Sequence, residues 1–239
     1  RIAGCLSSLH FAPTERARQN LLREGVADET VFVTGNTVVD ALKSIQLEER
    51  FDDEALAGLD YTRRRVLLVT AHRRENHGAR LLSICRALKT LVEDFEDVEV
   101  IYPVHLNPNV SGAVHEELDG VARVHLVKPV SYTDLLRLMS RCYLILTDSG
   151  GIQEEAPSFH KPVLVLRELT ERPEVIEAGA GKITGTDSAR IVEVAGQLLT
   201  DAREYKKMSS VENPFGDGHA AERIVRILNE RLNERRTDG

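Results

Sequence analysis

The chain has 239 residues, of which 42% are hydrophobic and 29% are charged, so it can form one large α/β domain or a domain with pieces of another. Its net charge of -7 argues against general binding to nucleic acid or to an anionic membrane, because both need a basic face. Three cysteines, odd in number and in no paired spacing, are typical of free thiols, so we expect a cytoplasmic protein.

The sequence of the first 64 residues predicts short helices and strands. Residues 1–30 predict a short helix, a short strand and a helix that Thr14 caps and Gly25 ends. A strand at 31–34 then turns into a helix through Gly35-Asn36, and a short helix with a polar loop follows. Because the chain begins inside a helical pattern and without a Met, we expect that it lacks an upstream portion.

From residue 65 onward, apolar strands alternate with amphipathic helices. The predicted strands cover 65–70, 98–104, 123–127, 143–147, 162–166 and 182–184. The predicted helices cover 80–94, 109–118, 132–140, 188–200, 202–209 and 218–233, with further helices beginning at 149 and 173. Strands that are apolar throughout predict a doubly wound, Rossmann-like parallel sheet with helices on both faces. Such sheets bind ligands beyond the carboxyl ends of their strands.

The strongest candidate site is the sequence TDSGGIQEE, which follows a predicted strand and opens a helix. Two glycines in a first helical turn, Gly150 and Gly151, allow the backbone to approach an anion closely. Ser149 caps the helix or donates its hydroxyl to a phosphate, and Glu154 or Glu155 can accept from ribose hydroxyls. The alternative is a tight strand-to-helix turn with an acidic first turn.

A second candidate, TAHRREN, also follows a predicted strand. The imidazole of His72 and the guanidiniums of Arg73 and Arg74 can neutralise and protonate a leaving phosphate there, although a charged surface loop has the same composition. His72 and His77 have no third ligand nearby in the sequence, so no metal site is expected.

Three further motifs follow strands or precede helices. His105 in YPVHLNPN either binds substrate or bonds the backbone of its loop. Arg172 precedes Pro173 at a predicted helix start, where a guanidinium is unfavourable unless an anion lies there too. The turn NPFGDG before the last helix predicts a structural role.

Together, FAPTERARQNLLREGV, VTGNTVVDAL, TAHRREN, YPVHLNPNV, LTDSGGIQEEAPS, KPVLVLRELTERPE and NPFGDG resemble the non-hydrolysing UDP-N-acetylglucosamine 2-epimerases over essentially the whole chain. The resemblance implies a GT-B type fold of two Rossmann-like domains with the active site between them. It implies interconversion of UDP-GlcNAc and UDP-ManNAc by elimination and re-addition of UDP through 2-acetamidoglucal. No nicotinamide, metal or other cofactor is required in that family.

The resemblance also implies roles for individual residues. The UDP-binding residues are Ser149, Gly150, Gly151 and Glu155. His72 and Arg172 match catalytic residues that face the diphosphate and stabilise departing UDP. Arg73 and His105 match a second, regulatory UDP-GlcNAc site that some bacterial members have. The full-length protein is expected to be a homodimer.

By the same resemblance, residues 1–30 are the tail of the first Rossmann-like domain, 31–213 form the UDP-binding domain and 214–239 form a helix that packs back on the first domain. Most of that first domain, which carries the proposed acid and base, has no counterpart here. The alternatives are therefore a nucleotide-sugar binding or regulatory module without turnover, or a hydrolysing epimerase; the motif match disfavours a glycosyltransferase.

We expect exposed apolar surface at Ile224, Leu228 and Leu232, and self-association.

Overall fold

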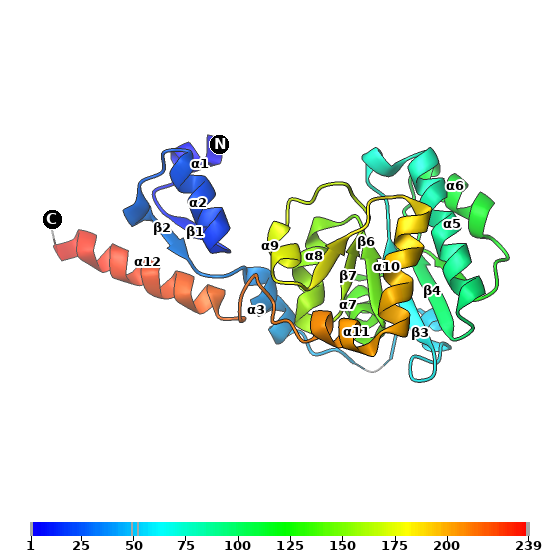
Figure 1. Ribbon diagram of the computed structural model, residues 1–239. Helices are drawn as coiled ribbons and strands as arrows, with labels where there is room; N and C mark the ends of the chain where they lie inside the picture. The colour runs from blue at the N-terminus through cyan, green and yellow to red at the C-terminus, as the bar shows by residue number, and fades with distance from the viewer. Residues whose placement is uncertain (1, 49, 52, 238–239) are drawn as a thin grey trace. The chain divides into compact units, whose positions relative to one another are not determined.

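The computed structural model describes residues 2–48, 50–51 and 53–237. The chain forms two compact units, labelled by element in Figure 1. Unit 1 comprises Arg1–Gln46 and Asn213–Gly239, and unit 2 comprises Leu47–Glu212.

Unit 2 contains a six-stranded parallel sheet in the order β5-β4-β3-β6-β7-β8. The strands are β3 (Arg65–Thr70), β4 (Val98–Pro103), β5 (Val124–Val127), β6 (Leu144–Thr147), β7 (Val163–Val165) and β8 (Gly181–Ile183). The chain builds outward from β3 to β5 and then returns to place β6 on the other side of β3. The strand order therefore reverses between β3 and β6, which is where sheets of this type bind ligands. The predicted doubly wound parallel sheet is confirmed.

Helices cover both faces of this sheet. They are α4 (Glu54–Ala57), α5 (Ala79–Asp94), α6 (Pro108–Leu118), α7 (Tyr132–Arg141), α8 (Gly150–Glu155), α9 (Pro173–Glu177), α10 (Ser188–Thr200) and α11 (Ala202–Ser209). Buried residues of α5, α6 and α10 form one cluster with Leu67, Val69 and Leu146. The alternate strand residues Val66 and Leu68 are also buried, so the opposite face of the sheet is covered as well.

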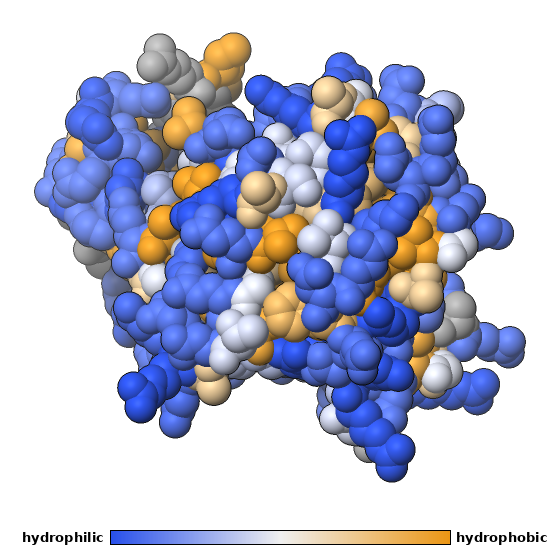
Figure 2. Space-filling view, turned by 45° about the vertical axis from the view of Figure 1, so that its right-hand side comes forward, coloured by the Kyte–Doolittle hydropathy of each residue, from blue (hydrophilic) through white to orange (hydrophobic). Residues whose placement is uncertain are grey.

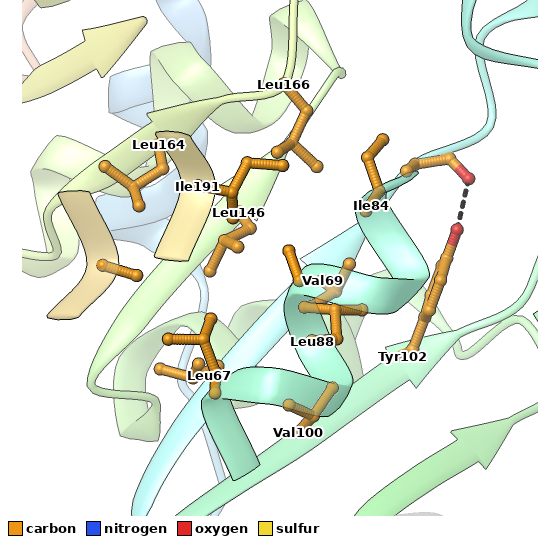
Figure 3. Close-up of a cluster of buried hydrophobic side chains, with 14 of the residues drawn as sticks. Leu67, Val69, Ile84, Leu88, Val100, Tyr102, Leu146, Leu164, Leu166 and Ile191 are labelled. Atoms are coloured by element: carbon orange, nitrogen blue, oxygen red, sulfur yellow. Dashed lines mark hydrogen bonds between the residues drawn. The ribbon is translucent and has the colours of Figure 1, made fainter. Parts of the chain in front are cut away.

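The main core lies between the sheet and α5 (Figure 3). Leu67, Leu88 and Leu146 are fully buried there. Tyr102 is also buried, and its hydroxyl donates a hydrogen bond of 2.6 Å to the carbonyl of Ala71. Burial raises the pKa of Tyr102 well above its usual value of 10.0, so the hydroxyl stays a donor. This bond ties the core to the loop that follows β3.

Unit 1 has a two-stranded parallel sheet of β1 (His10–Ala12) and β2 (Val31–Val33). Its helices are α1 (Ile2–Leu6), α2 (Glu15–Arg23), α3 (Thr37–Ser44) and α12 (Ala220–Thr237). Thr14 Oγ1 accepts from the amide of Ala17 at 3.1 Å, which confirms the predicted cap of α2.

Residues 31–46, which the sequence assigned to the UDP-binding domain, are grouped with unit 1 in this structure. The amide of Asn36 donates to the carbonyl of Phe215 at 2.7 Å. Asp40 accepts from the first amides of α12, those of Ala220 and Ala221, at 3.1 and 2.7 Å. Gly35 has a φ of +90°, and a Cβ there would meet the Phe215 carbonyl at 3.4 Å. These contacts bind the NPFGDG turn and α12 to β2 and α3.

The surface is largely polar on the face shown in Figure 2, with small apolar areas between the charged residues. In α12, Leu228 is 36% exposed and Val225 is 56% exposed, whereas Ile224 is half-buried. The side chain of Leu232 lies outside the described residues. None of the described helices is both long enough and apolar enough to cross a bilayer.

Candidate nucleotide-binding site

The site begins where β3 and β6 end side by side. Thr70 and Thr147 are register partners at those ends, and their hydroxyls are hydrogen-bonded at 2.6 Å. Thr147 Oγ1 also accepts from the amide of Ser149 at 2.9 Å. The starts of the two following loops are therefore held at a fixed separation at the point where the strand order reverses.

A buried carboxylate joins these two loops. Asp148 is 0% exposed, and its Oδ2 accepts from the amides of His72 and Arg73 at 2.9 and 2.8 Å. The same oxygen accepts from Asn76 Nδ2 at 3.0 Å. The loop after β3 is thereby shaped by a residue that follows β6. Sequence reasoning gave Asp148 no role, although an aspartate between a buried strand and a glycine turn is a signal for one.

Two guanidiniums lie over the glycine turn that opens α8. A Cβ at Gly150 would lie 3.6 Å from the guanidinium of Arg172 and 3.7 Å from that of Arg73. Arg172 is held by an ion pair with Glu154, and Arg73 lies 3.6 Å from Glu171. Backbone amides at a helix start and two cations around them form an anion-binding arrangement.

Ser149 occupies the N-cap position of α8, but its side chain makes no capping hydrogen bond. Of the two roles that the sequence left open for its hydroxyl, the capping role is therefore excluded in this structure. Arg172 occupies the N-cap position of α9, as expected.

Beside the turn lies a cavity of about 300 Å³. Its lining combines apolar residues from the loops after β4 and β5 with polar groups of the turn: Thr70, His72, Pro103, His105, Pro129, Val130, Tyr132, Leu135, Ser149, Gly151, Ile152 and Glu155. The imidazoles of His72 and His105 are stacked, with centroids 5.4 Å apart and planes 13° apart. The cavity is thus polar toward the turn and apolar at Pro129 and Leu135.

Glu155 is the carboxylate in the wall of this cavity. It is 8% exposed and accepts from the hydroxyl of Tyr132 at 3.0 Å. Burial raises the pKa of Glu155 above its usual value of 4.5 and raises the pKa of Tyr132 to about 12. Glu154 is engaged with Arg172, so the structure distinguishes the two glutamates that the sequence left as alternatives.

All the residues predicted for the site therefore lie at one edge of the sheet. The structure brings Arg73 to the same glycine turn as Arg172, and His105 to the same cavity as His72. Tyr132 and the apolar lining were missed, because nothing in the sequence shows which loops face the glycine turn. Among the described residues, no group of three or more His, Cys, Asp or Glu side chains is placed to hold a metal ion.

A doubly wound sheet with a glycine turn and cations at its reversal point is typical of α/β proteins of the Rossmann type. The family model described as UDP-N-acetylglucosamine 2-epimerase matches residues 1–229. The chain belongs to this family, as the resemblance implied.

Individual relatives agree with this assignment. A Thermotoga maritima protein is 54% identical over 229 residues, which are 95% of this chain and 60% of that protein. The structure of Staphylococcus aureus MnaA with UDP is 44% identical with a TM-score of 0.90, over 96% of this chain and 62% of that one. The Neisseria meningitidis UDP-GlcNAc 2-epimerase bound to UDP-GlcNAc is 42% identical with a TM-score of 0.88, over 95% and 62%. The chain thus spans about three fifths of the length of these relatives and shares the fold of the corresponding part of their GT-B-like structures.

Proposed function

We propose that this chain binds UDP and UDP-GlcNAc and is the UDP-binding half of an isomerase, a UDP-N-acetylglucosamine 2-epimerase that interconverts UDP-GlcNAc and UDP-ManNAc. The observation that carries the proposal is the pair of guanidiniums over Gly150 beside a cavity with a buried carboxylate. The relatives solved with UDP and with UDP-GlcNAc support it.

In the proposed complex, the diphosphate accepts hydrogen bonds from the hydroxyl of Ser149 and from the amides of Gly150 and Gly151. The nucleoside enters the adjoining cavity, where the ribose hydroxyls donate to Glu155. The uracil ring packs on the apolar lining at Pro129. Polar groups then set the orientation of the ligand, while burial of the base supplies affinity.

The reaction breaks the bond between the anomeric carbon and the diphosphate, so negative charge grows on departing UDP. Arg172 and His72 stabilise that charge more strongly in the transition state than in the substrate, which lowers the barrier. UDP stays bound while the C2 proton is lost and regained, and then adds back. The acid and base for C2 are proposed to lie in the first Rossmann-like domain, as the resemblance implies.

Arg73 and His105 are proposed as contacts to a second, regulatory UDP-GlcNAc. Their position supports a site next to the first ligand, because Arg73 lies at the same turn and His105 stacks on His72. A binding or regulatory module without turnover uses the same residues, so activity must be measured directly.

The test is a proton NMR time course of UDP-GlcNAc with the purified chain in D2O. Loss of the C2 proton signal with formation of UDP-ManNAc shows that the chain epimerises. Line broadening of UDP-GlcNAc without turnover shows a binding half or a regulatory module, and release of free UDP and ManNAc shows hydrolysis. An unchanged spectrum without broadening contradicts the proposal.

We further propose a homodimer in the full-length protein and a cytoplasmic location. The buried free thiols Cys85 and Cys142 suit a reducing compartment. Exposed apolar side chains in unit 1, including Val225 and Leu228, supply surface for association. Sedimentation as a monodisperse monomer, with no binding of a dye for apolar surface, contradicts the association.

A further inference from the structure

Asp148 has a carboxylate oxygen that the fold leaves without a hydrogen bond. The residue is 0% exposed, and Oδ1 is a buried polar atom without a partner among the described residues. The other oxygen, Oδ2, accepts three hydrogen bonds that shape the loop after β3. This structural role of Asp148 therefore uses one carboxylate oxygen and leaves Oδ1 unexplained. A buried charged atom without a partner is costly and calls for a function.

The unpaired oxygen faces the imidazole of His72. Asp148 Oδ1 lies 3.7 Å from His72 Nδ1, slightly beyond hydrogen-bonding distance. The His72 side chain is 42% exposed, so a small rotation of the ring can close this gap. Hydrogen bonds in ligand-free sites are often long and shorten when the ligand binds.

Among the described residues, the neighbouring imidazoles of His105 and His77 make their contacts away from His72 Nδ1. His105 stacks on its face, and the Nδ1 of His105 accepts from the amide of Asn107 at 3.1 Å. His77 Nε2 lies 3.3 Å from the His72 carbonyl rather than from its ring. Arg73, the next residue, is a cation whose guanidinium lies over Gly150.

We propose that Asp148 is a positioning residue that accepts a hydrogen bond from Nδ1–H of His72. When the ring carries both protons, Nε2, its other nitrogen, presents an N–H to the anion at the glycine turn. In that doubly protonated form the ring donates a charge-assisted hydrogen bond to the departing diphosphate. The pairing itself rests on the geometry, whereas its use toward UDP rests on the proposed function.

The first test reads the protons of His72 directly in the whole chain. With 15N-labelled histidine, two-bond proton–nitrogen correlations report which ring nitrogens carry a proton, and His72→Gln assigns the signal. We expect a protonated Nδ1 on His72. A bare Nδ1 with the proton on Nε2 alone overturns the proposal, without the need for any variant of Asp148.

The second test changes the acceptor while retaining the loop. In Asp148→Asn the amide oxygen still accepts from the backbone, while the amide NH2 faces His72 Nδ1 and drives its proton to Nε2. Asp187→Asn makes the same change at the cap of α10 and is the matched control. We expect the proton shift in D148N alone, and an unchanged His72 signal in folded D148N overturns the proposal.

Calorimetry then separates positioning from a merely structural role. D148N is expected to weaken UDP about tenfold, the effect of one hydrogen bond to a charged group, and to weaken uridine less than twofold because uridine lacks the diphosphate. Equal losses for both ligands, or none for UDP, overturn the proposal. A wild-type chain that binds no UDP but has a protonated Nδ1 instead contradicts the proposed function and supports the pairing.

Discussion

The two compact units bury apolar side chains to very different extents. In unit 2, whole strands are buried, and side chains such as Leu67 and Leu146 are 0% exposed. In the described part of unit 1, the buried hydrophobic residues are few and mostly small: Ala12, Val31, Val39, Phe215 and Ala220. A two-stranded sheet with so small a core is marginal alone, whereas a six-stranded sheet covered on both faces is a rigid frame.

The candidate site lies in unit 2, where the extensive core can hold its side chains in place. The charged groups of a catalytic site must be held within fractions of an ångström. Only then do they stabilise the transition state more than the bound substrate. The Thr70–Thr147 hydroxyl pair and the Tyr102–Ala71 bond transmit the rigidity of the core to the two loops. Unit 1 has exposed apolar side chains in place of such a frame.

A leucine-to-alanine substitution in each unit is expected to change the free energy of unfolding by very different amounts. Leu146→Ala in β6 is expected to lower the free energy of unfolding by about 3 kcal/mol, because it leaves a cavity in a fully packed core. Leu228→Ala in α12 removes a side chain that is 36% exposed and is expected to cost less than about 1 kcal/mol. Urea unfolding followed by circular dichroism measures both, and equal losses would break the comparison.

A pair of glycines comes next. Gly150→Ala is expected to fold, because the added Cβ makes ordinary contacts, but to weaken UDP by roughly thirtyfold, about 2 kcal/mol, since it fills the anion position. Gly35→Ala in unit 1 is expected to lower stability and to leave UDP binding intact. Its φ of +90° makes alanine strained by about 1–2 kcal/mol, and UDP affinity stays unchanged. Calorimetry and thermal melts on both variants check this; retained UDP affinity in G150A would contradict the proposed site.

Substituting one arginine in each unit is expected to have a smaller effect on UDP affinity. Arg172→Ala is expected to weaken UDP about tenfold by removing one cation at the diphosphate. Arg223→Ala in unit 1 breaks an ion pair with Asp217 and a bond to the Thr34 carbonyl, and it is expected to leave UDP affinity unchanged. Titrations at two salt concentrations measure this, and a weaker salt dependence is expected for R172A only.

The smallest effect concerns Glu155 and pH. Burial raises the pKa of Glu155, and the ribose hydroxyls donate best to its ionised form. As the pH falls from 7.5 through that raised pKa, the carboxylate gains a proton and uridine affinity is expected to fall about threefold. Uridine is used because its lack of a phosphate removes the titration of the ligand. Glu155→Gln is expected to bind weakly at every pH, and a parallel pH dependence in E155Q would rule out Glu155 as the cause.

The sequence predicted the order of elements well, because fully apolar strands such as RVLLVT are unambiguous in an alternating α/β pattern. It also placed Ser149 and His72 after strands. It could not give the strand order, which brings β6 beside β3, because pairing depends on tertiary packing. For the same reason it missed Asp148 and Tyr132, whose partners lie on other loops.

The most direct test of the central claim is a UDP titration followed by amide chemical shifts of the 15N-labelled chain. The largest shifts are expected at Ser149, Gly150, Gly151 and His72, while the amides of Gly35 and Gly216 in unit 1 are expected to show none. Shifts confined to unit 1, or no shifts at millimolar UDP, would contradict a UDP site at the edge of the unit 2 sheet.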